Sequence, residues 1–489
     1  MNKMINLRNI FIAALAALLL LAACSDDDSF TTSTSRLLTF STDTVRLDTV
    51  FSNVPSPRRD MWVYNRSGEG IRCTNIRLER GNQSGFRVNV DGTYLGASSG
   101  YQTNQVELRD KDSLRVFVEV TTPYNHAGKP NLVDDNLIFT LESGVVQKVN
   151  LNVYSWDAQL LRDVKISRDS VLSSGATPII IYGGITVEEG ATLTIAAGTT
   201  LYFHADAGID VFGRLNILGN ADENVVLRGD RIDRMFDYLP YDGVSGQWRG
   251  IRFHETSYDN WLQFADIHST FDGIVADSSD VSRLKLTLHS STIHNCQGYG
   301  LRSVNSRIHL INSQITNTLR DCLCVDGGWA EVNACTLAQF YPFDALRGVA
   351  LRFLSTNFDL QQFVCENSLV TGYSEVEMMG EQGRDEAVFN YAFSHCIIRD
   401  TTNINYVDTV NIFKKVVFEN DEDTSAIYGR KHFANIDTKN LRYDFRLDSL
   451  STAIGKADPA TSPENDRQGR RRDEKPDIGA FEFFGSKNE

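Results

Sequence analysis

A repeat of 22 residues near the middle of the chain limits its fold more than any other feature of the sequence. Apolar residues between polar neighbours recur at Ile293, Ile315 and Leu337, so both steps are 22 residues long. One step earlier the spacing is slightly longer, because Ile267 lies 26 residues before Ile293. Repeats of this length, made of short β-rich segments, are typical of solenoids in which neighbouring units bury a shared core.

The residues around the repeat favour one kind of solenoid. Residues 165–440 contain short strand-like pieces separated by Gly, Asn, Asp and Ser, and the leucine-and-asparagine pattern of leucine-rich repeats is missing. A second apolar position also repeats after 22 residues, from Leu301 to Leu323. We therefore predict a right-handed parallel β-helix filled by ladders of like residues. Asn295 and Asn317 share one register, where we expect their amides to stack and hydrogen-bond between coils.

Two further stretches resemble a known class. Gly246–Ile251 looks like the coil opening of β-helix repeat proteins of the pectin-lyase-like class, and Phe445–Asp458, Asp466–Arg470 and Asp477–Glu482 are similar to the closing segment of many secreted β-helix proteins. An open solenoid end exposes apolar surface and unpaired strand edges. We therefore expect residues 441–484, called the C-terminal segment, to cap the last coil. The resemblance implies a fold and leaves the activity open.

Residues 36–157 are expected to form a separate all-β domain. Seven strand-like segments separated by turn-forming clusters predict a sandwich. The alternation over Asp112–Val120 resembles the immunoglobulin-like domains that bacterial surface proteins use as spacers. The predicted fold class is therefore all-β, with an immunoglobulin-like β-sandwich followed by a right-handed parallel β-helix and a C-terminal cap. The seven segments are Leu37–Phe40, Met61–Tyr64, Ile71–Leu78, Phe86–Val90, Leu114–Val120, Leu137–Leu141 and Val145–Val153.

The first 23 residues have the pattern of a secretory signal peptide. Lys3 and Arg8 precede an apolar run from Ile10 to Leu21, which is too short and wrongly flanked for a spanning helix. The run ends in Leu-Ala-Ala before Cys24, which resembles the lipobox of bacterial lipoproteins. In that family the signal is cut before the cysteine, which is then acylated. The alternative is a plain signal peptide followed by an unrelated cysteine.

The residues after Cys24 bear on where the protein faces. Ser25–Asp28 looks like the acidic export tag of surface-displayed lipoproteins of Bacteroidota, while any lipoprotein could carry an acidic tether. Residues 24–35 lack a core-forming pattern and are predicted to be a lipidated, flexible tether. We expect an outer-membrane lipoprotein that faces the cell exterior, with the membrane as a partner through its lipid anchor.

The net charge bears on the partners of the protein, and the cysteine content bears on its disulfides. The net charge of −15, without a long basic block, argues against nucleic acid as a partner. Seven cysteines besides Cys24 cannot all pair within one chain, and most have apolar neighbours. We expect them to be small buried hydrophobes. A disulfide between Cys296 and Cys324, or between Cys335 and Cys365, stays open.

The repeat itself brings candidate chemistry together. If Ile267 stacks under Ile293, then Asp266 lies under Thr292 and His268 under His294, with Asp272 on the same coil. Asp266, His268, Asp272 and His294 are therefore the candidate catalytic residues, as an acid–base pair, a metal site or a sugar-binding strip. The alternative is ordinary polar decoration of an outward sheet face. Motifs of polygalacturonases and pectate lyases are absent.

An insertion at residues 230–246 supplies a second candidate site. Insertions into single coils often carry binding, and aromatic rings stack on sugars. The binding candidates are therefore the aromatic residues of the insertion, Phe236, Tyr238 and Tyr241, together with Trp248 just after it. The same side chains could equally cover hydrophobic core that would otherwise be exposed to solvent.

The leading expectation for function is non-catalytic binding of a glycan or another cell-surface component through the β-helix. One alternative is a polysaccharide lyase or glycoside hydrolase on this fold, and another is a structural component of a surface assembly. We expect no cofactor, with calcium as the ion that would accompany the enzymatic alternative.

Overall fold

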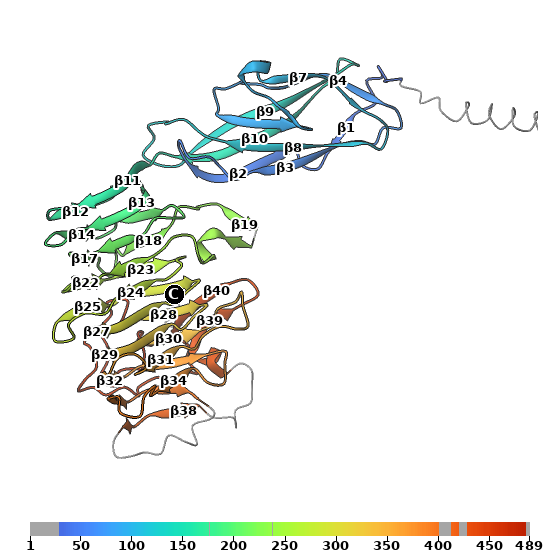
Figure 1. Ribbon diagram of the computed structural model, residues 1–489. Helices are drawn as coiled ribbons and strands as arrows, with labels where there is room; N and C mark the ends of the chain where they lie inside the picture. Colours follow the sequence, from blue (N-terminus) through green and yellow to red (C-terminus); the bar gives the residue numbers. More distant parts are fainter. Residues whose placement is uncertain (1–28, 176, 237, 401–411, 420–427, 486–489) are drawn as a thin grey trace, which may run out of the picture. The chain divides into compact units, whose positions relative to one another are not determined.

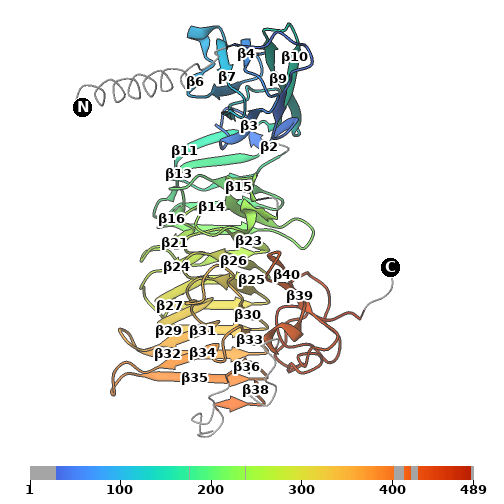
Figure 2. The same cartoon turned by 90° about the vertical axis from the view of Figure 1, so that its right-hand side faces the viewer.

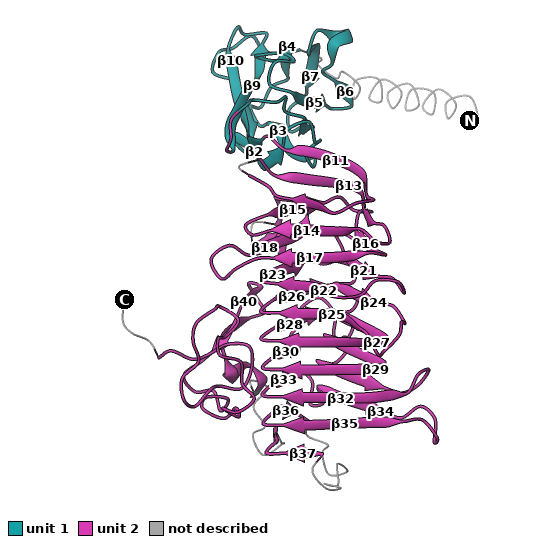
Figure 3. Ribbon diagram, turned by 90° about the vertical axis from the view of Figure 1, so that its left-hand side faces the viewer, with its two compact units in different colours: residues 1–126, 130–156 teal, residues 127–129, 157–489 magenta. Residues whose placement is uncertain are grey.

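The computed structural model describes residues 29–175, 177–236, 238–400, 412–419 and 428–485. The predicted signal peptide, Cys24 and the acidic tag lie outside these residues. The chain divides into two compact units, residues 1–126 with 130–156 and residues 127–129 with 157–489 (Figure 3). In the described part, a helix of the length and apolar character needed to cross a membrane is not found.

The first unit is a β-sandwich of two five-stranded sheets, in agreement with the predicted fold class (Figure 1). Its strands alternate between core and solvent, so that Val116, Val118 and Val120 are fully buried. One sheet contains, in order, β1 (Leu38–Phe40), β3 (Arg59–Asn65), β8 (Ser113–Val120), β5 (Phe86–Val90) and β6 (Thr93–Tyr94). The other contains β2 (Thr44–Phe51), β10 (Val146–Trp156), β9 (Asn131–Leu141), β4 (Ile71–Leu78) and β7 (Gln102–Leu108).

The second unit is a parallel β-helix of 26 strands (Figures 1 and 2). Each strand pairs in parallel with a strand of the next coil, and the coils form three faces. Face A contains β11 (Gln159–Ile166), β13 (Ile179–Val187), β16 (Ile209–Val211), β21 (Ile251–Phe253), β24 (Ile274–Ala276), β27 (Leu301–Ile311), β29 (Leu323–Asn333), β31 (Leu351–Leu354) and β34 (Met378–Glu381).

Faces B and C complete each coil. Face B contains the second halves of β27 and β29 together with β12 (Ser170–Leu172), β14 (Thr192–Ala196), β17 (Arg214–Leu218), β22 (Asn260–Gln263), β25 (Leu284–His289), β32 (Leu360–Glu366), β35 (Phe389–Ser394) and β37 (Phe413–Lys414). Face C contains the first halves of β11 and β13 together with β15 (Thr200–Phe203), β18 (Val225–Gly229), β23 (Ala265–His268), β26 (Thr292–Cys296), β28 (Gln314–Thr318), β30 (Thr336–Gln339), β33 (Leu369–Gly372), β36 (Ile397–Arg399) and β38 (Val417–Glu419).

Apolar ladders fill the interior, as the repeat predicted. On face C, Ile267 pairs with Ile293, Ile293 with Ile315, and Ile315 with Leu337. All four side chains are fully buried. The ladder on face A runs through Ile185, Ile209, Ile251, Ile274, Leu301, Leu323, Leu351 and Met378. The ladder on face B runs through Ile195, Ile217, Leu262, Leu288, Leu310, Val332, Cys365 and Phe393.

A left-handed residue turns the chain from face B to face C in successive coils. Asparagine adopts this conformation with little strain, whereas most other side chains do not. The flanking strands are fixed by their ladders, so they hold even unfavourable residues in place. The turn residues with positive φ are Phe264, Ser290, Asn312, Ala334, Asn367, His395 and Lys415.

Asn295 and Asn317 occupy equivalent places in consecutive coils, as predicted, but the expected amide ladder is incomplete. The buried Oδ1 of Asn317 has no hydrogen-bond partner among the described residues. Both residues instead have positive φ, 54° at Asn295 and 56° at Asn317. Their shared contribution is therefore a backbone conformation that asparagine tolerates well.

The C-terminal segment packs along the side of the coils and not over the last coil, where we expected it (Figure 2). Arg467 donates to Asn224 and Thr292, and the N–H of Ala480 donates to Oγ1 of Thr336. These contacts join the segment to coils well before the last one. Its first strand, β40 (Arg442–Leu447), pairs antiparallel with β39 (Phe433–Asp437), which lies just before the segment.

A change in the outward residues of face C explains this position. The outward column that begins with Asp266 and Thr292 becomes apolar in later coils, at Leu369 and Ile397. Apolar residues on an outward face need cover. Leu369 and Ile397 form a separate core with residues that include Phe445, Phe481 and others of the C-terminal segment.

The seven described cysteines are all buried and free. Neither disulfide left open by the sequence is formed: Cys296, Cys335 and Cys365 belong to the core, whereas Cys324 is in register with Arg302 and Arg352 on the outward side of face A. Cys365, for example, belongs to the ladder of face B, and its Sγ lies 3.9 Å from Sγ of Cys396. The prediction that they act as small buried hydrophobes agrees with these positions.

Candidate functional site

Two consecutive strands of face C bring the predicted aspartate and histidines together. Asp266 and His268 lie on either side of the buried Ile267 on β23, so both point outward. Parallel pairing places Thr292 of β26 beside Asp266 and His294 beside His268. This arrangement is the one that the 26-residue step predicts.

Hydrogen bonds join these side chains into one cluster, called the His268 network, of Asp242, Asp266, His268 and His294. Nδ1 of His268 lies 3.0 Å from Oδ1 of Asp266, and Nε2 lies 2.8 Å from Oδ1 of Asp242. Nε2 of His294 lies 3.2 Å from the same Asp266 oxygen, and the two imidazole rings stack with centroids 4.7 Å apart. Arg228 holds Asp242 from the other side, with 2.8 Å between Nη1 and Oδ1.

The network keeps His268 protonated at neutral pH. Its side chain is buried, and burial disfavours the charged imidazole, but the carboxylates of Asp266 and Asp242 outweigh burial and raise its pKa to about 9. Burial also disfavours ionised Asp242, but the hydrogen bond and charge of His268 lower the pKa of Asp242 to about 2. Both carboxylates are therefore ionised at neutral pH, and both ring nitrogens of His268 donate.

The cluster fits a salt-bridged network better than a metal centre. The ligand atoms of Asp266, His268 and His294 lie within 4.8 Å of one another, a spacing that could surround an ion. A histidine binds a metal only through a deprotonated nitrogen, and both nitrogens of His268 are bonded to carboxylates. Calcium prefers several oxygen ligands, and the network offers only the two carboxylates that already bind His268.

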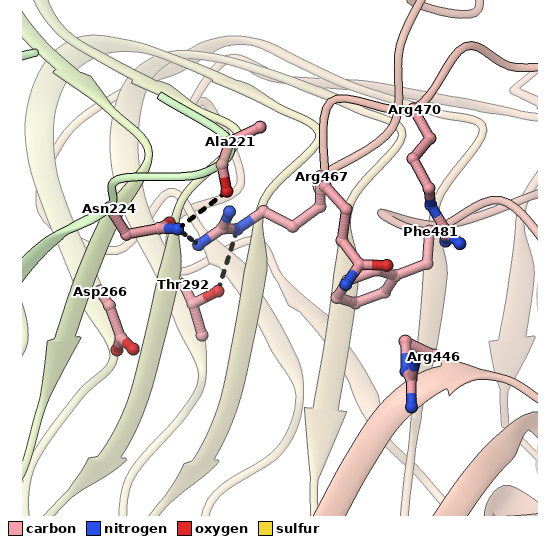
Figure 4. Close-up of a pocket in the computed structure, with 9 residues that line it drawn as sticks. Ala221, Asn224, Asp266, Thr292, Arg446, Arg467, Arg470 and Phe481 are labelled. Atoms are coloured by element: carbon pink, nitrogen blue, oxygen red, sulfur yellow. Dashed lines mark hydrogen bonds between the residues drawn. The ribbon is translucent and has the colours of Figure 1, made fainter. Parts of the chain in front are cut away.

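A pocket opens beside Asp266, between face C and the C-terminal segment (Figure 4). It has a volume of about 510 Å³. We call it the arginine pocket, because three guanidinium groups line it. Figure 4 shows Arg467 reaching between Asn224 and Thr292, while Arg446 and Arg470 lie on the side away from Asp266. Its lining residues are Ala221, Asn224, Asp266, Thr292, Arg446, Arg467, Gln468, Arg470 and Phe481.

A tight turn presents two of these arginines. Oδ1 of the buried Asp466 accepts the backbone N–H groups of Gln468 and Arg470, and its Oδ2 lies 3.1 Å from Nη2 of Arg470. Gly469 has a φ of 75°, and a side chain there would begin 2.8 Å from Cβ of Ala221. Glycine is needed at this position both for the backbone conformation and for the close approach to the coil.

The other predicted site residues lie elsewhere. Asp272 is not part of the His268 network, because it lies beyond the next turn, where its carboxylate accepts the N–H of Tyr299 at 2.8 Å. Trp248 is 1% exposed, stacks on Phe203 with ring centroids 4.2 Å apart, and donates to the carbonyl of His268. The prediction of Trp248 as a binding residue is therefore wrong, since its ring fills the interior.

The aromatic residues of the insertion divide into two groups. Phe236 and Tyr238 are both more than half exposed and stack with centroids 5.7 Å apart. They remain binding candidates. The ring of Tyr241 instead lies under the guanidinium of Arg231, 3.7 Å from its central carbon. The insertion also supplies Asp242 and is tied to the coil by Ser269, which donates to the Asp242 carbonyl.

Sequence reasoning missed Asp242, Arg228 and the arginine pocket. Arg228 could have been found, because it follows Leu227, which pairs with Ile267 one coil later. Asp242 lies in an irregular insertion, where no register applies. Arg467 lies 175 residues after Thr292, and only the docking of the C-terminal segment brings the two together.

No family model matches the chain, and no curated protein matches it. Matching solved structures include a protein of unknown function from Porphyromonas gingivalis W83, at 14% identity over 28% of this chain and 58% of that chain, with a TM-score of 0.18. A family 123 glycoside hydrolase from Clostridium perfringens matches at 7% identity over 24% of this chain and 26% of its own, with a TM-score of 0.17. A PapD-like domain of human CEP192 matches at 11% identity over 27% and 92%, with a TM-score of 0.16. At such TM-scores these likenesses carry no argument.

Proposed function

We propose that the protein is a pectin-lyase-like lipoprotein of the outer membrane that is displayed on the cell surface and binds a glycan without cleaving it. The lipobox at Cys24 and the acidic residues after it support the anchor and its outward display. The arginine pocket is the proposed contact with the glycan, and the stacked rings of Phe236 and Tyr238 are a second candidate contact.

One observation carries this proposal. The arginine pocket is accessible, but the acidic and basic side chains beside it, Asp266 and His268, are already hydrogen-bonded to each other. A general acid or base needs a site within hydrogen-bond reach of the reacting atom. Both ring nitrogens of His268 are occupied by Asp266 and Asp242, and Asp266 also accepts from His294. The His268 network is therefore better suited to hold the side of a binding site in place than to transfer a proton to or from a ligand.

The test is a screen of residues 29–489 against neutral and acidic polysaccharides, with and without calcium. Retention on immobilised glycan, absorbance of unsaturated products and release of reducing ends are recorded together. We expect retention of at least one glycan without new chain ends. The doubly substituted variant Phe236→Ala/Tyr238→Ala separates the contribution of the insertion, and Leu346→Ala, which removes a side chain 91% exposed outside both sites, is its matched control.

Two outcomes would overturn the proposal. New chain ends that disappear in Asp266→Asn or His268→Gln would establish the alternative of a lyase or hydrolase. Failure to retain any polysaccharide would leave the structural assembly role as the better account.

A further inference from the structure

The arginine pocket contains a buried guanidinium, that of Arg467, on which the charges of Asp266 and Asp466 act from a distance without a direct ion pair. Arg467 is 8% exposed, and its Nε and Nη2 donate to neutral oxygens, Oγ1 of Thr292 at 3.0 Å and Oδ1 of Asn224 at 3.0 Å. Burial lowers its pKa to about 10, so the guanidinium remains charged at neutral pH. Among the described residues, no carboxylate forms an ion pair with it. A buried charge is costly unless it is paired.

The other two arginines keep donors free for a ligand. A guanidinium carries five N–H donors. Arg446 uses Nε and Nη2 to bind Asp444, and Arg470 uses Nη2 to bind Asp466 and the Glu482 carbonyl. Among the described residues, Nη1 of Arg446 and Nη1 of Arg470 form no hydrogen bond, whereas the partnerless Nε of Arg470 is buried. The pocket therefore combines unpaired charge at Arg467 with unused donors at Arg470.

The carboxylate of Asp266 does not cancel this charge. It accepts hydrogen bonds from His268 and His294, and the charge of the protonated His268 is shared between Asp266 and Asp242. Asp242 is in turn paired with Arg228. The acidic groups near the pocket thus all have cationic partners of their own, and Arg467 is left in excess.

We propose that the arginine pocket binds the anionic group, a carboxylate or a sulfate, of an acidic saccharide. The proposal rests on the glycan-binding function proposed above and names its ligand class. Guanidinium groups bind such oxyanions through paired N–H donors with a geometry that suits both. The ring of Phe481, which also lines the pocket, offers an apolar surface for the sugar.

The test uses residues 29–489 and three monosaccharide probes, measured by calorimetric titration at low salt. The probes are glucuronate, glucose 6-sulfate and neutral glucose. We expect at least one of the two anions to bind about tenfold more tightly than glucose, because hydrogen bonds to charged groups are the stronger class. Preference for glucuronate identifies a uronic acid ligand, and preference for glucose 6-sulfate identifies a sulfated one.

Variants connect binding to the pocket. Arg446→Gln/Arg470→Gln should weaken binding of the preferred anion about tenfold and leave glucose unchanged. Arg471→Gln is the matched control, because Arg471 lies on the same turn but is 80% exposed and pairs with Glu464 outside the pocket. Arg467→Lys keeps the positive charge of the third pocket arginine. A thermal midpoint equal to that of the native chain would show that the C-terminal segment still docks in this variant.

The outcomes separate this inference from the proposed function. Anions that bind no better than glucose, or binding that survives Arg446→Gln/Arg470→Gln, would overturn the inference. If a neutral polysaccharide is retained in the screen at the same time, the proposed function stands alone. Anion binding that depends on the arginines, in a chain that retains no polysaccharide, would support the pocket and overturn the glycan function.

Discussion

His268 shows how one buried residue can organise a surface region. An imidazolium in an apolar setting is unstable, but here each ring nitrogen has its own carboxylate, Asp266 on the coil and Asp242 on the insertion. The histidine therefore fixes the insertion to face C by charge as well as by hydrogen bonds. Removing it would leave two carboxylates close together and without their shared partner.

This arrangement predicts a pH dependence of stability. The folded pKa of His268 is about 9 and its usual value is 6.5, so its contribution is complete below pH 6.5, falls as the pH rises, and is lost above pH 9. The free energy of unfolding should therefore fall between pH 6.5 and 9 in the native chain and stay flatter in His268→Gln. Urea titrations across this range measure it. His309→Gln, which removes an outward histidine whose pKa burial lowers, should retain the native slope.

The same residues show what the sequence could reveal about the site. Asp266, His268 and His294 were predictable, because parallel pairing preserves position from coil to coil. Asp272 was placed wrongly, because it lies past Ser269, whose φ of 62° ends the regular alternation of β23. Asp242 and Arg467 come from segments outside the repeat, and their positions depend on long-range packing that spacing does not encode.

At the level of elements, the C-terminal segment is secured by buried polar contacts to the coils. Arg472 is almost completely buried, pairs with the equally buried Glu482 at 3.1 Å, and donates to Oδ1 of Asn312 on the solenoid. Asn312 in turn donates to the carbonyl of Asn465. The ion pair lies within the segment and holds Arg472 in position, and the two hydrogen bonds of Asn312 join the segment to the coils.

Arg472→Ala should loosen the C-terminal segment. Removing one partner of a buried ion pair leaves the other charge uncompensated and costs about 3–5 kcal/mol. Limited proteolysis should release fragments ending near residue 440, and the thermal midpoint should fall. Arg471→Ala breaks an exposed pair worth about 0–1 kcal/mol, so equal proteolysis of the two variants would contradict the role given to Arg472.

The elements also show where sequence patterns fail. Seven of the ten strands of the sandwich were predicted from alternation, and β2, β6 and β7 were missed. In β2 the alternation of Val45 and Leu47 is interrupted at Asp48, which has a φ of 63°, and afterwards Val50 and Phe51 are both buried. The register of β2 against β10 shifts at this point, as a bulge requires. The ladders of the β-helix were predictable because their turns keep the same length over several coils.

For the whole molecule, the proposed anchor depends on one atom, the sulfur of Cys24. Cys24→Ser should abolish incorporation of labelled fatty acid and move the protein from the membrane fraction to the soluble fraction, because the acylated cysteine is the proposed attachment point. Fractionation of cells expressing each form measures the change. Ser25→Ala, one residue further along, is the control and should remain in the membrane. A membrane-bound Cys24→Ser would show that the anchor lies elsewhere.

If the chain is exported as proposed, the lateral position of the C-terminal segment has a consequence for the order of folding. A chain that leaves the secretion pore from its N-terminus can stack its coils one after another as they emerge. Leu369 and Ile397 would nevertheless stay in contact with water until Phe445 and Phe481 arrive. The segment that covers this flank thus emerges after the coils it covers, and a product truncated before residue 441 would keep an exposed apolar surface that proteases and chaperones can recognise.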